Sequence, residues 1–128
     1  MTLAYLDTSA FVKTIVEEPE SERLTGWLEQ WPDRASCALL RTEAVRALRP
    51  HGPEAVAAAR AGFRSLQVVQ LDERLLDAAG DLPVESRSLD AIHVAAALAL
   101  GPDLGALVTY DHRMGAVARS LGITVVSP

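Results

Sequence analysis

Short apolar runs alternate along the chain with amphipathic segments. Apolar and β-branched residues dominate the runs 3–6, 35–40, 66–71, 105–110 and 123–126. Between them, apolar residues recur at helical spacing over 8–16, 21–31, 42–48, 54–64, 73–79, 89–100 and 112–121. An apolar run without polar alternation is typical of a strand covered on both faces, as in a parallel sheet. The pattern therefore predicts an α/β fold of three layers, α/β/α, around a mainly parallel sheet of about five strands.

Residues suited to helix ends stand at several of the junctions between these segments. The helix after the first strand can be capped by Thr8 or Ser9, or by Asp7, because Asp is among the best N-cap residues, and Asp72 is expected to cap the helix that begins at Glu73. Gly122 is expected to end the last helix. These residues support the predicted alternation of strands and helices.

The segment 89–100 is apolar nearly all round, which predicts a helix that is covered on most sides. His93 lies within this segment. We expect it to be a packed, hydrogen-bonded core residue rather than a metal ligand. Cys37 is likewise expected to pack in the core.

Composition narrows the class of protein. With 128 residues, 49% apolar and 23% charged, the chain is expected to form one globular domain over 1–128. The longest apolar stretch, 91–100, falls far short of the ~20 residues that span a bilayer, so no membrane association is expected. A single cysteine rules out an intramolecular disulfide and suits the cytoplasm, where we expect the protein to work. The net charge of −5 argues against a protein that coats nucleic acid, but not against a nuclease whose acids hold cations.

Four carboxylates stand at junctions that a parallel sheet brings to one edge. Asp7 and Asp111 each end an apolar strand, Glu43 lies in the first turn of a helix entered from a strand, and Asp90 opens the apolar helix. Each acid alone suits a helix N-terminus, by about 0.3–1 kcal/mol. Four crowded carboxylates repel one another, and a hard divalent cation with oxygen ligands relieves the repulsion. The set therefore predicts a Mg²⁺ or Mn²⁺ site.

Other chemistries fit the sequence less well. Neither G-x-x-x-x-G-K-[ST] nor G-x-G-x-x-G nor G-x-S-x-G occurs, and no cysteine and histidine set has the spacing of zinc ligands. A phosphotransferase that uses Asp7 as nucleophile remains an alternative. However, Lys13 is the only lysine, and no lysine follows a late strand to balance the phosphate charge.

Four motifs together resemble the PIN-domain family, and in size and order the chain resembles VapC-type toxins of type II toxin-antitoxin pairs. The motifs are Leu6-Asp7-Thr8-Ser9-Ala10, Glu43, the stretch Ser88 to Ala97, and Val108-Thr109-Tyr110-Asp111. The resemblance implies a Mg²⁺- or Mn²⁺-dependent endoribonuclease, often dimeric, that a neighbouring antitoxin holds inactive. It assigns the family acids to Asp7, Glu43, Asp90 and Asp111, and nearby second-shell hydroxyls to Thr8, Ser9 and Thr109. Many members carry a further acid after the fourth, where His112 and Arg113 stand here, so the number of metal ions stays open.

The expected reaction is hydrolysis of an RNA phosphodiester bond by a water that one or two divalent ions activate. Glu43 is either a metal ligand or the group that orients the water. An inactive PIN-like binding module is a further alternative, which an RNA cleavage assay would separate. An exposed basic face is expected to contact RNA or an acidic partner, and it comprises Arg46, Arg49, Arg60 and Arg64. Trp27 and Trp31 are candidates for an apolar patch in a homodimer.

Overall fold

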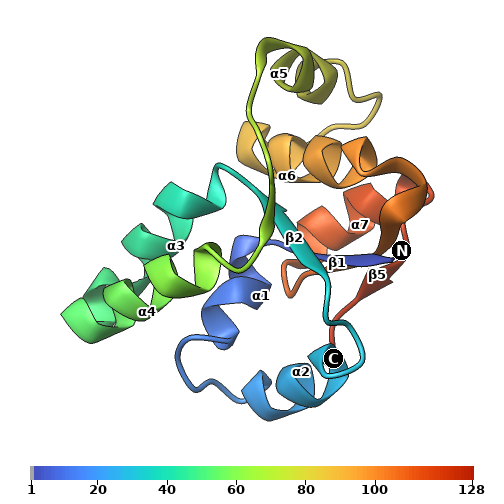
Figure 1. Ribbon diagram of the computed structural model, residues 1–128. Helices are drawn as coiled ribbons and strands as arrows, with labels where there is room; N and C mark the ends of the chain where they lie inside the picture. The colour runs from blue at the N-terminus through green and yellow to red at the C-terminus, as the bar shows by residue number, and fades with distance from the viewer. Residues whose placement is uncertain (1) are drawn as a thin grey trace.

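The computed structural model describes residues 2–128 and contains a five-stranded parallel sheet with helices on both faces (Figure 1). The strands are β1 (Leu3–Leu6), β2 (Arg34–Cys37), β3 (Gln67–Val69), β4 (Leu104–Val108) and β5 (Val125–Val126). The helices are α1 (Thr8–Lys13), α2 (Ser21–Leu28), α3 (Leu40–Leu48), α4 (Pro53–Phe63), α5 (Glu73–Gly80), α6 (Ser88–Ala99) and α7 (His112–Ser120). Short 3₁₀ turns lie at Arg49–His51 and Gly101–Asp103. The predicted three-layer α/β/α architecture is confirmed.

The strand order is β3-β2-β1-β4-β5, with every pair parallel. The chain leaves the central strand β1 toward β2 and β3, then returns to pair β4 with the other edge of β1. The direction of winding thus reverses between β1 and β4. In open α/β sheets, ligands bind at the carboxyl ends of the strands beside such a reversal.

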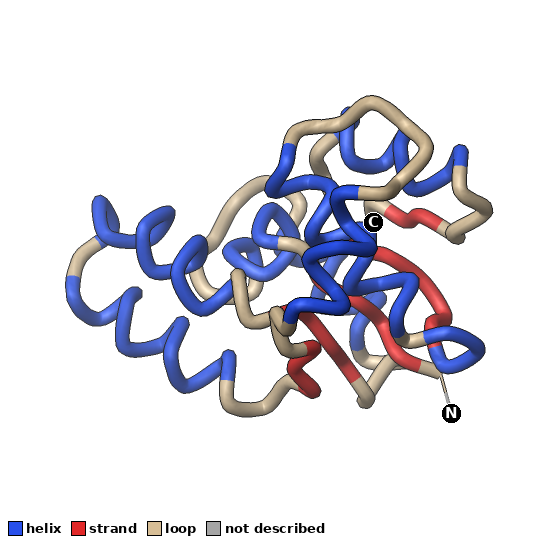
Figure 2. Tube along the Cα trace, turned by 90° about the horizontal axis from the view of Figure 1, so that it is seen from above, coloured by secondary structure: helices blue, strands red, loops and turns tan. Residues whose placement is uncertain are grey.

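The two helical layers follow from the strand pleat and the reversal of winding. Alternate residues of β1 face opposite layers, so Tyr5 joins the core under α5, α6 and α7 while Leu6 joins the core under α1 to α4. Leu107 and Val108 of β4 divide in the same way. In Figure 1 the sheet lies between α6 on one side and α1 and α2 on the other, and Figure 2, seen from above, shows helices lying across the strands.

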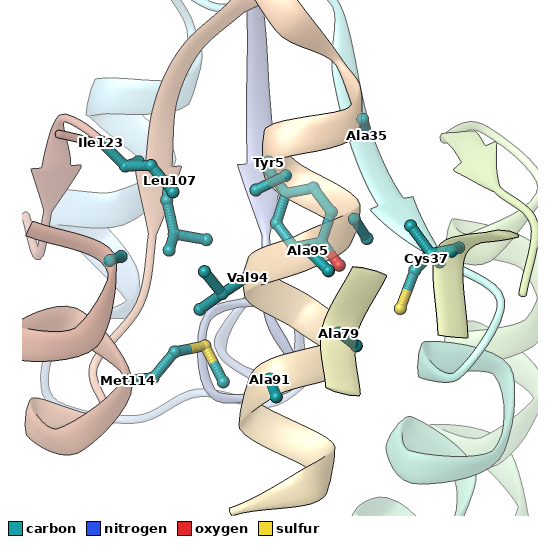
Figure 3. Packing of buried hydrophobic residues seen from close by; sticks show 14 of the residues in the cluster. Tyr5, Ala35, Cys37, Ala79, Ala91, Val94, Ala95, Leu107, Met114 and Ile123 are labelled. Atoms are coloured by element: carbon teal, nitrogen blue, oxygen red, sulfur yellow. The ribbon is translucent and has the colours of Figure 1, made fainter. Parts of the chain in front are cut away.

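Helix α6 fills the space over one face of the sheet because small side chains let it approach closely. Val94, Ala95, Ala96 and Ala97 are all buried. In Figure 3, Leu107 and Met114 lie on one side of α6, and Ala79 and Cys37 on the other. The expectation that this helix is covered holds for its middle, whereas Leu89 and Leu98 near its ends are exposed. Cys37 is buried as predicted.

Several predicted helix ends are confirmed. Asp72 caps α5 by accepting a hydrogen bond from the backbone N of Leu75. Gly122, with φ of 83°, follows α7, and the amide of Ile123 reaches back to the carbonyl of Ala118, which is the Schellman arrangement.

The structure decides between the candidates for the first cap and shortens one predicted helix. Asp7, not Thr8 or Ser9, caps α1, because the backbone N of Ala10 donates to Asp7 Oδ1. Helix α2 ends at Leu28, before Trp31.

The tryptophans pack on each other and on the core. The rings of Trp27 and Trp31 stack with centroids 4.8 Å apart, and both side chains are partly buried. The large exposed apolar side chains of residues 2–128 are instead Leu76, Leu89 and Leu98. Within the same residues, no helix has the length and apolar character needed to cross a membrane.

Candidate active site

The four predicted acids lie at the ends of elements that meet beside the reversal between β1 and β4. Asp7 follows β1 and caps α1, and Asp111 caps α7 two residues after Thr109. Glu43 lies in the first turn of α3 and Asp90 in the first turn of α6. Asp7, Glu43 and Asp111 therefore stand where parallel strands end and helices begin, at the edge that binds ligands in this class of sheet, whereas Asp90 opens a helix that is entered from the loop after α5.

Asp7 is a buried carboxylate held by four hydrogen bonds. Its side chain is 2% exposed. Oδ1 accepts from the amide of Ala10 at 2.9 Å and from Ser9 Oγ at 2.8 Å. Oδ2 accepts from Thr109 Oγ1 at 2.5 Å and from Ser9 Oγ at 3.0 Å. Burial raises the pKa of Asp7, and the hydrogen bonds from Thr109, Ala10 and Ser9 oppose that rise without cancelling it.

Thr109 connects Asp7 to Asp111. The parallel register pairs Leu6 with Val108, which sets the next residues, Asp7 and Thr109, side by side. Thr109 Oγ1 donates to Asp7 and accepts from the backbone N of Asp111 at 3.0 Å. Asp111 Oδ1 in turn accepts from the amides of Arg113 and Met114 at 2.9 and 3.1 Å.

Glu43 has a cationic partner, unlike Asp7. Its Oε1 accepts from Thr8 Oγ1 at 2.6 Å and lies 2.6 Å from His93 Nε2. Burial favours the neutral acid, but the hydrogen bonds from His93 and Thr8 and the charge of His93 outweigh burial and lower the pKa of Glu43. Thr8 therefore holds Glu43, whereas Ser9 and Thr109 hold Asp7.

His93 is buried between Glu43 and the core, as a packed and hydrogen-bonded residue, which confirms that prediction. Its Nδ1 lies 2.8 Å from Tyr5 Oη and 3.7 Å from Cys37 Sγ. Burial alone would lower the pKa of His93, but the interactions with Cys37 and Glu43 raise it to about 10. Burial also keeps the pKa of Tyr5 well above its usual value. A protonated His93 then donates from Nε2 to Glu43 and from Nδ1 to Tyr5.

Among the four acids, the side chain of Asp90 has the fewest partners within residues 2–128. Its Oδ2 lies 3.5 Å from Arg87 Nε, and its side chain is 14% exposed. It stands three residues before His93 on α6, so the two share a side of that helix.

The chemistry of the donors fits a hard divalent cation. Asp7 is a carboxylate buried without a cation in contact among residues 2–128, and its raised pKa records the cost of that charge. Asp7, Asp90 and Asp111 could hold such an ion. The structure links Asp7 with Asp111 through Thr109, but across 2–128 no three carboxylate, imidazole or thiol groups enclose a point where a metal would sit.

The basic face predicted from the sequence lies on the hairpin of α3 and α4, which we call the basic hairpin. Arg46, Arg49, Arg60 and Arg64 are exposed, as expected. Arg49 and Arg60 line a hollow of about 480 Å³ between α3 and α4.

The pairing of Glu43 with His93 was not anticipated from the sequence, because the two residues lie far apart in the chain. The pair of Arg87 and Asp90 could have been found, since opposite charges three residues apart meet on a helix.

Comparison with known proteins gives a consistent result. The PIN domain profile matches residues 4–120. The chain is 48% identical over its full length to "Ribonuclease VapC46" of Mycobacterium tuberculosis, 99% of which is covered. A solved toxin-antitoxin complex from Klebsiella pneumoniae superposes with a TM-score of 0.75 at 19% identity, covering 98% of this chain and 97% of that one. M. tuberculosis VapC20, described as a sarcin-ricin loop cleaving toxin, also gives 0.75, at 18% identity, with 98% and 99% covered.

A double-mutant cycle tests the ion pair of Glu43 and His93. We expect Glu43→Met and His93→Leu each to lower the free energy of unfolding in EDTA, because each leaves a largely buried partner unpaired. The double variant should be more stable than the sum of the two losses predicts, by about 2 kcal/mol. Urea unfolding curves measure all four proteins.

The pair of Lys13 and Glu20, 2.9 Å apart with side chains 12% and 31% exposed, is more accessible to water than His93 and Glu43 and provides the control. Lys13→Met and Glu20→Gln should show a smaller coupling because water screens that pair. Additive losses at Glu43 and His93 would show that the short contact contributes nothing to folding.

Proposed function

The chain belongs to the PIN-domain family, and we propose that it is a metal-dependent endoribonuclease, the toxin of a type II toxin-antitoxin pair. The observation that carries the proposal is the buried carboxylate of Asp7 at the reversal of the sheet, tied through Thr109 to Asp111. The identity of 48% with a curated ribonuclease supports the same activity. We propose that one PIN-like domain over 1–128 carries it.

The proposed cofactor is Mg²⁺ or Mn²⁺, which when bound would activate a water and neutralise charge on the scissile phosphate. Asp7, Asp90 and Asp111 supply the oxygen ligands that such ions prefer. Thr109 and Ser9 fix the orientation of Asp7 through its two oxygens. These residues thus hold the negative charge of the site in place before substrate arrives.

We assign Glu43 the task of orienting the attacking water. Thr8 and His93 both donate to Oε1, and the lowered pKa keeps the carboxylate ionised near neutral pH. An ionised carboxylate is an acceptor that can hold a water by its proton. Direct attack of water on phosphorus requires no covalent enzyme intermediate.

A phosphotransferase mechanism is disfavoured by the surroundings of Asp7. Within residues 2–128 no lysine or arginine pairs with Asp7, so nothing beside it would balance the charge of a transferred phosphate. Lys13 pairs with Glu18 and Glu20 rather than with Asp7.

The proposed partners are an RNA substrate, a cognate antitoxin and a second copy of the chain. Toxin-antitoxin complexes among the structures of the same fold support the antitoxin as a partner.

A cytoplasmic location would suit the buried Cys37, which forms no disulfide. The homodimer rests on the family; light scattering that gives a monomer mass at micromolar concentration would refute it.

Replacing Asp111 by asparagine separates charge from capping. Asn accepts hydrogen bonds from the amides of Arg113 and Met114 as Asp does, so the fold of Asp111→Asn should be unaffected. Loss of the negative charge should lower cleavage of a labelled RNA in Mg²⁺ or Mn²⁺ by about 10²-fold or more.

The control is Asp72→Asn, which removes a charge from the N-cap of α5, where Asp72 accepts from the amide of Leu75. It should cleave RNA as the parent does. Equal rates for the parent and both variants would remove Asp111 from the site, and no cleavage by the parent with either metal would overturn the enzymatic function.

The antitoxin should compete with metal at the acidic edge. A basic side chain placed among the carboxylates would relieve their repulsion as a divalent ion does. We therefore expect inhibition by the cognate partner to weaken as Mg²⁺ is raised at constant ionic strength, in the same cleavage assay. A partner that inhibits equally at all Mg²⁺ concentrations would place its contacts elsewhere.

A further inference from the structure

An open hollow of about 540 Å³ lies beside the acidic edge, between the start of α6 and α7. Asp90 forms part of its wall, and Ala116 and Val117 supply apolar surface. Arg87 and Arg113 also line it. The volume lies in the range of small-ligand sites, about 300–1,000 Å³, so a nucleotide unit fits.

The two arginines are available to a ligand. Arg113 is exposed and forms no ion pair within residues 2–128. The side chain of Arg87 is 65% exposed, and its one contact is the long one to Asp90 at 3.5 Å. Neither guanidinium is therefore committed to holding the fold together.

Arg87 and Arg113 both lie at helix N-termini, where a positive charge lowers helix stability. Arg87 immediately precedes α6, and Arg113 is the second residue of α7. The partial positive charge at a helix N-terminus disfavours a cation there. Two arginines placed against this preference, on one hollow, indicate a role outside folding.

We propose that Arg87 and Arg113 bind a backbone phosphate of the RNA next to the phosphodiester that is cleaved. The inference rests on the proposed function, because it takes Asp90 as part of the catalytic edge. An RNA chain cleaved beside Asp90 must continue past it, and the hollow adjoins that residue. The planar fork of arginine matches phosphate oxygens, and it would neutralise the charge of a neighbouring phosphate that a metal at the cleaved bond would not reach.

The site is distinct from the basic hairpin of Arg46, Arg49, Arg60 and Arg64. Arg49 and Arg60 line the separate hollow between α3 and α4, which contains none of the four acids. The hairpin can add long-range attraction, whereas Arg87 and Arg113 adjoin the reacting groups. The two sets therefore predict different kinetic effects.

Arg113→Gln is the most direct test, because the backbone N of residue 113 keeps its bond to Asp111 while the side-chain charge is lost. Removing a contact to a phosphate that does not react should raise KM for RNA about tenfold and leave kcat within about twofold. Arg113→Lys should recover most of the loss. In EDTA, where no cleavage occurs, the slope of log affinity against log salt for a single-stranded RNA should fall by about 0.7.

Arg119→Gln, in the last turn of the same helix, removes an equal charge and should change neither KM nor the salt slope. Equal effects of Arg113→Gln and Arg119→Gln, or a fall in kcat with unchanged KM, would overturn the phosphate contact. So would a variant that binds RNA normally but no longer binds the antitoxin. In all these outcomes the parent still cleaves RNA; a parent inactive with Mg²⁺ and Mn²⁺ would instead refute the proposed function.

Discussion

The buried charge of Asp7 is the constraint on which the site depends. A carboxylate at 2% exposure loses nearly all of its hydration, and its four hydrogen bonds do not fully replace that hydration, since the pKa remains raised. Parallel pairing of β1 with β4 places the hydroxyl of Thr109 on Asp7. The fold thus buries the carboxylate of Asp7 where the winding of the sheet reverses. A bound cation would compensate the negative charge of that carboxylate.

Glu43 differs from Asp7 because its negative charge already has a positive partner. Its charge is balanced by His93, which is in turn held by the hydroxyl of Tyr5 from the sheet. A carboxylate that already has its counter-charge gains less from a metal than Asp7 does. This contrast is why we assign Asp7 to cation binding and Glu43 to the water, although both acids stand at the same edge.

The sequence predicted the strands and most helices well, because both depend on local patterns. The apolar runs marked the five strands, and Asp7 and Asp111 follow two of them as expected, while their part in a metal site stays a prediction. The sequence left the cap of α1 open between Asp7, Thr8 and Ser9, because Asp, Thr and Ser are all good caps and spacing does not rank them. The bond from His93 to Glu43 joins α6 to α3, and Arg87 and Arg113 line one hollow only once α6 and α7 pack together. Such pairs depend on tertiary packing, which no periodicity reports.

The central claim is that the buried carboxylate of Asp7 binds a cation, and thermal unfolding of Asp7→Asn with and without metal tests it most directly. In EDTA we expect Asp7→Asn to be as stable as the parent or more stable, because Asn still accepts from the amide of Ala10 and removes a buried charge. Mg²⁺ or Mn²⁺ should raise the Tm of the parent and of the control Asp72→Asn, but not of Asp7→Asn. A metal-induced rise of equal size in all three proteins would contradict the account.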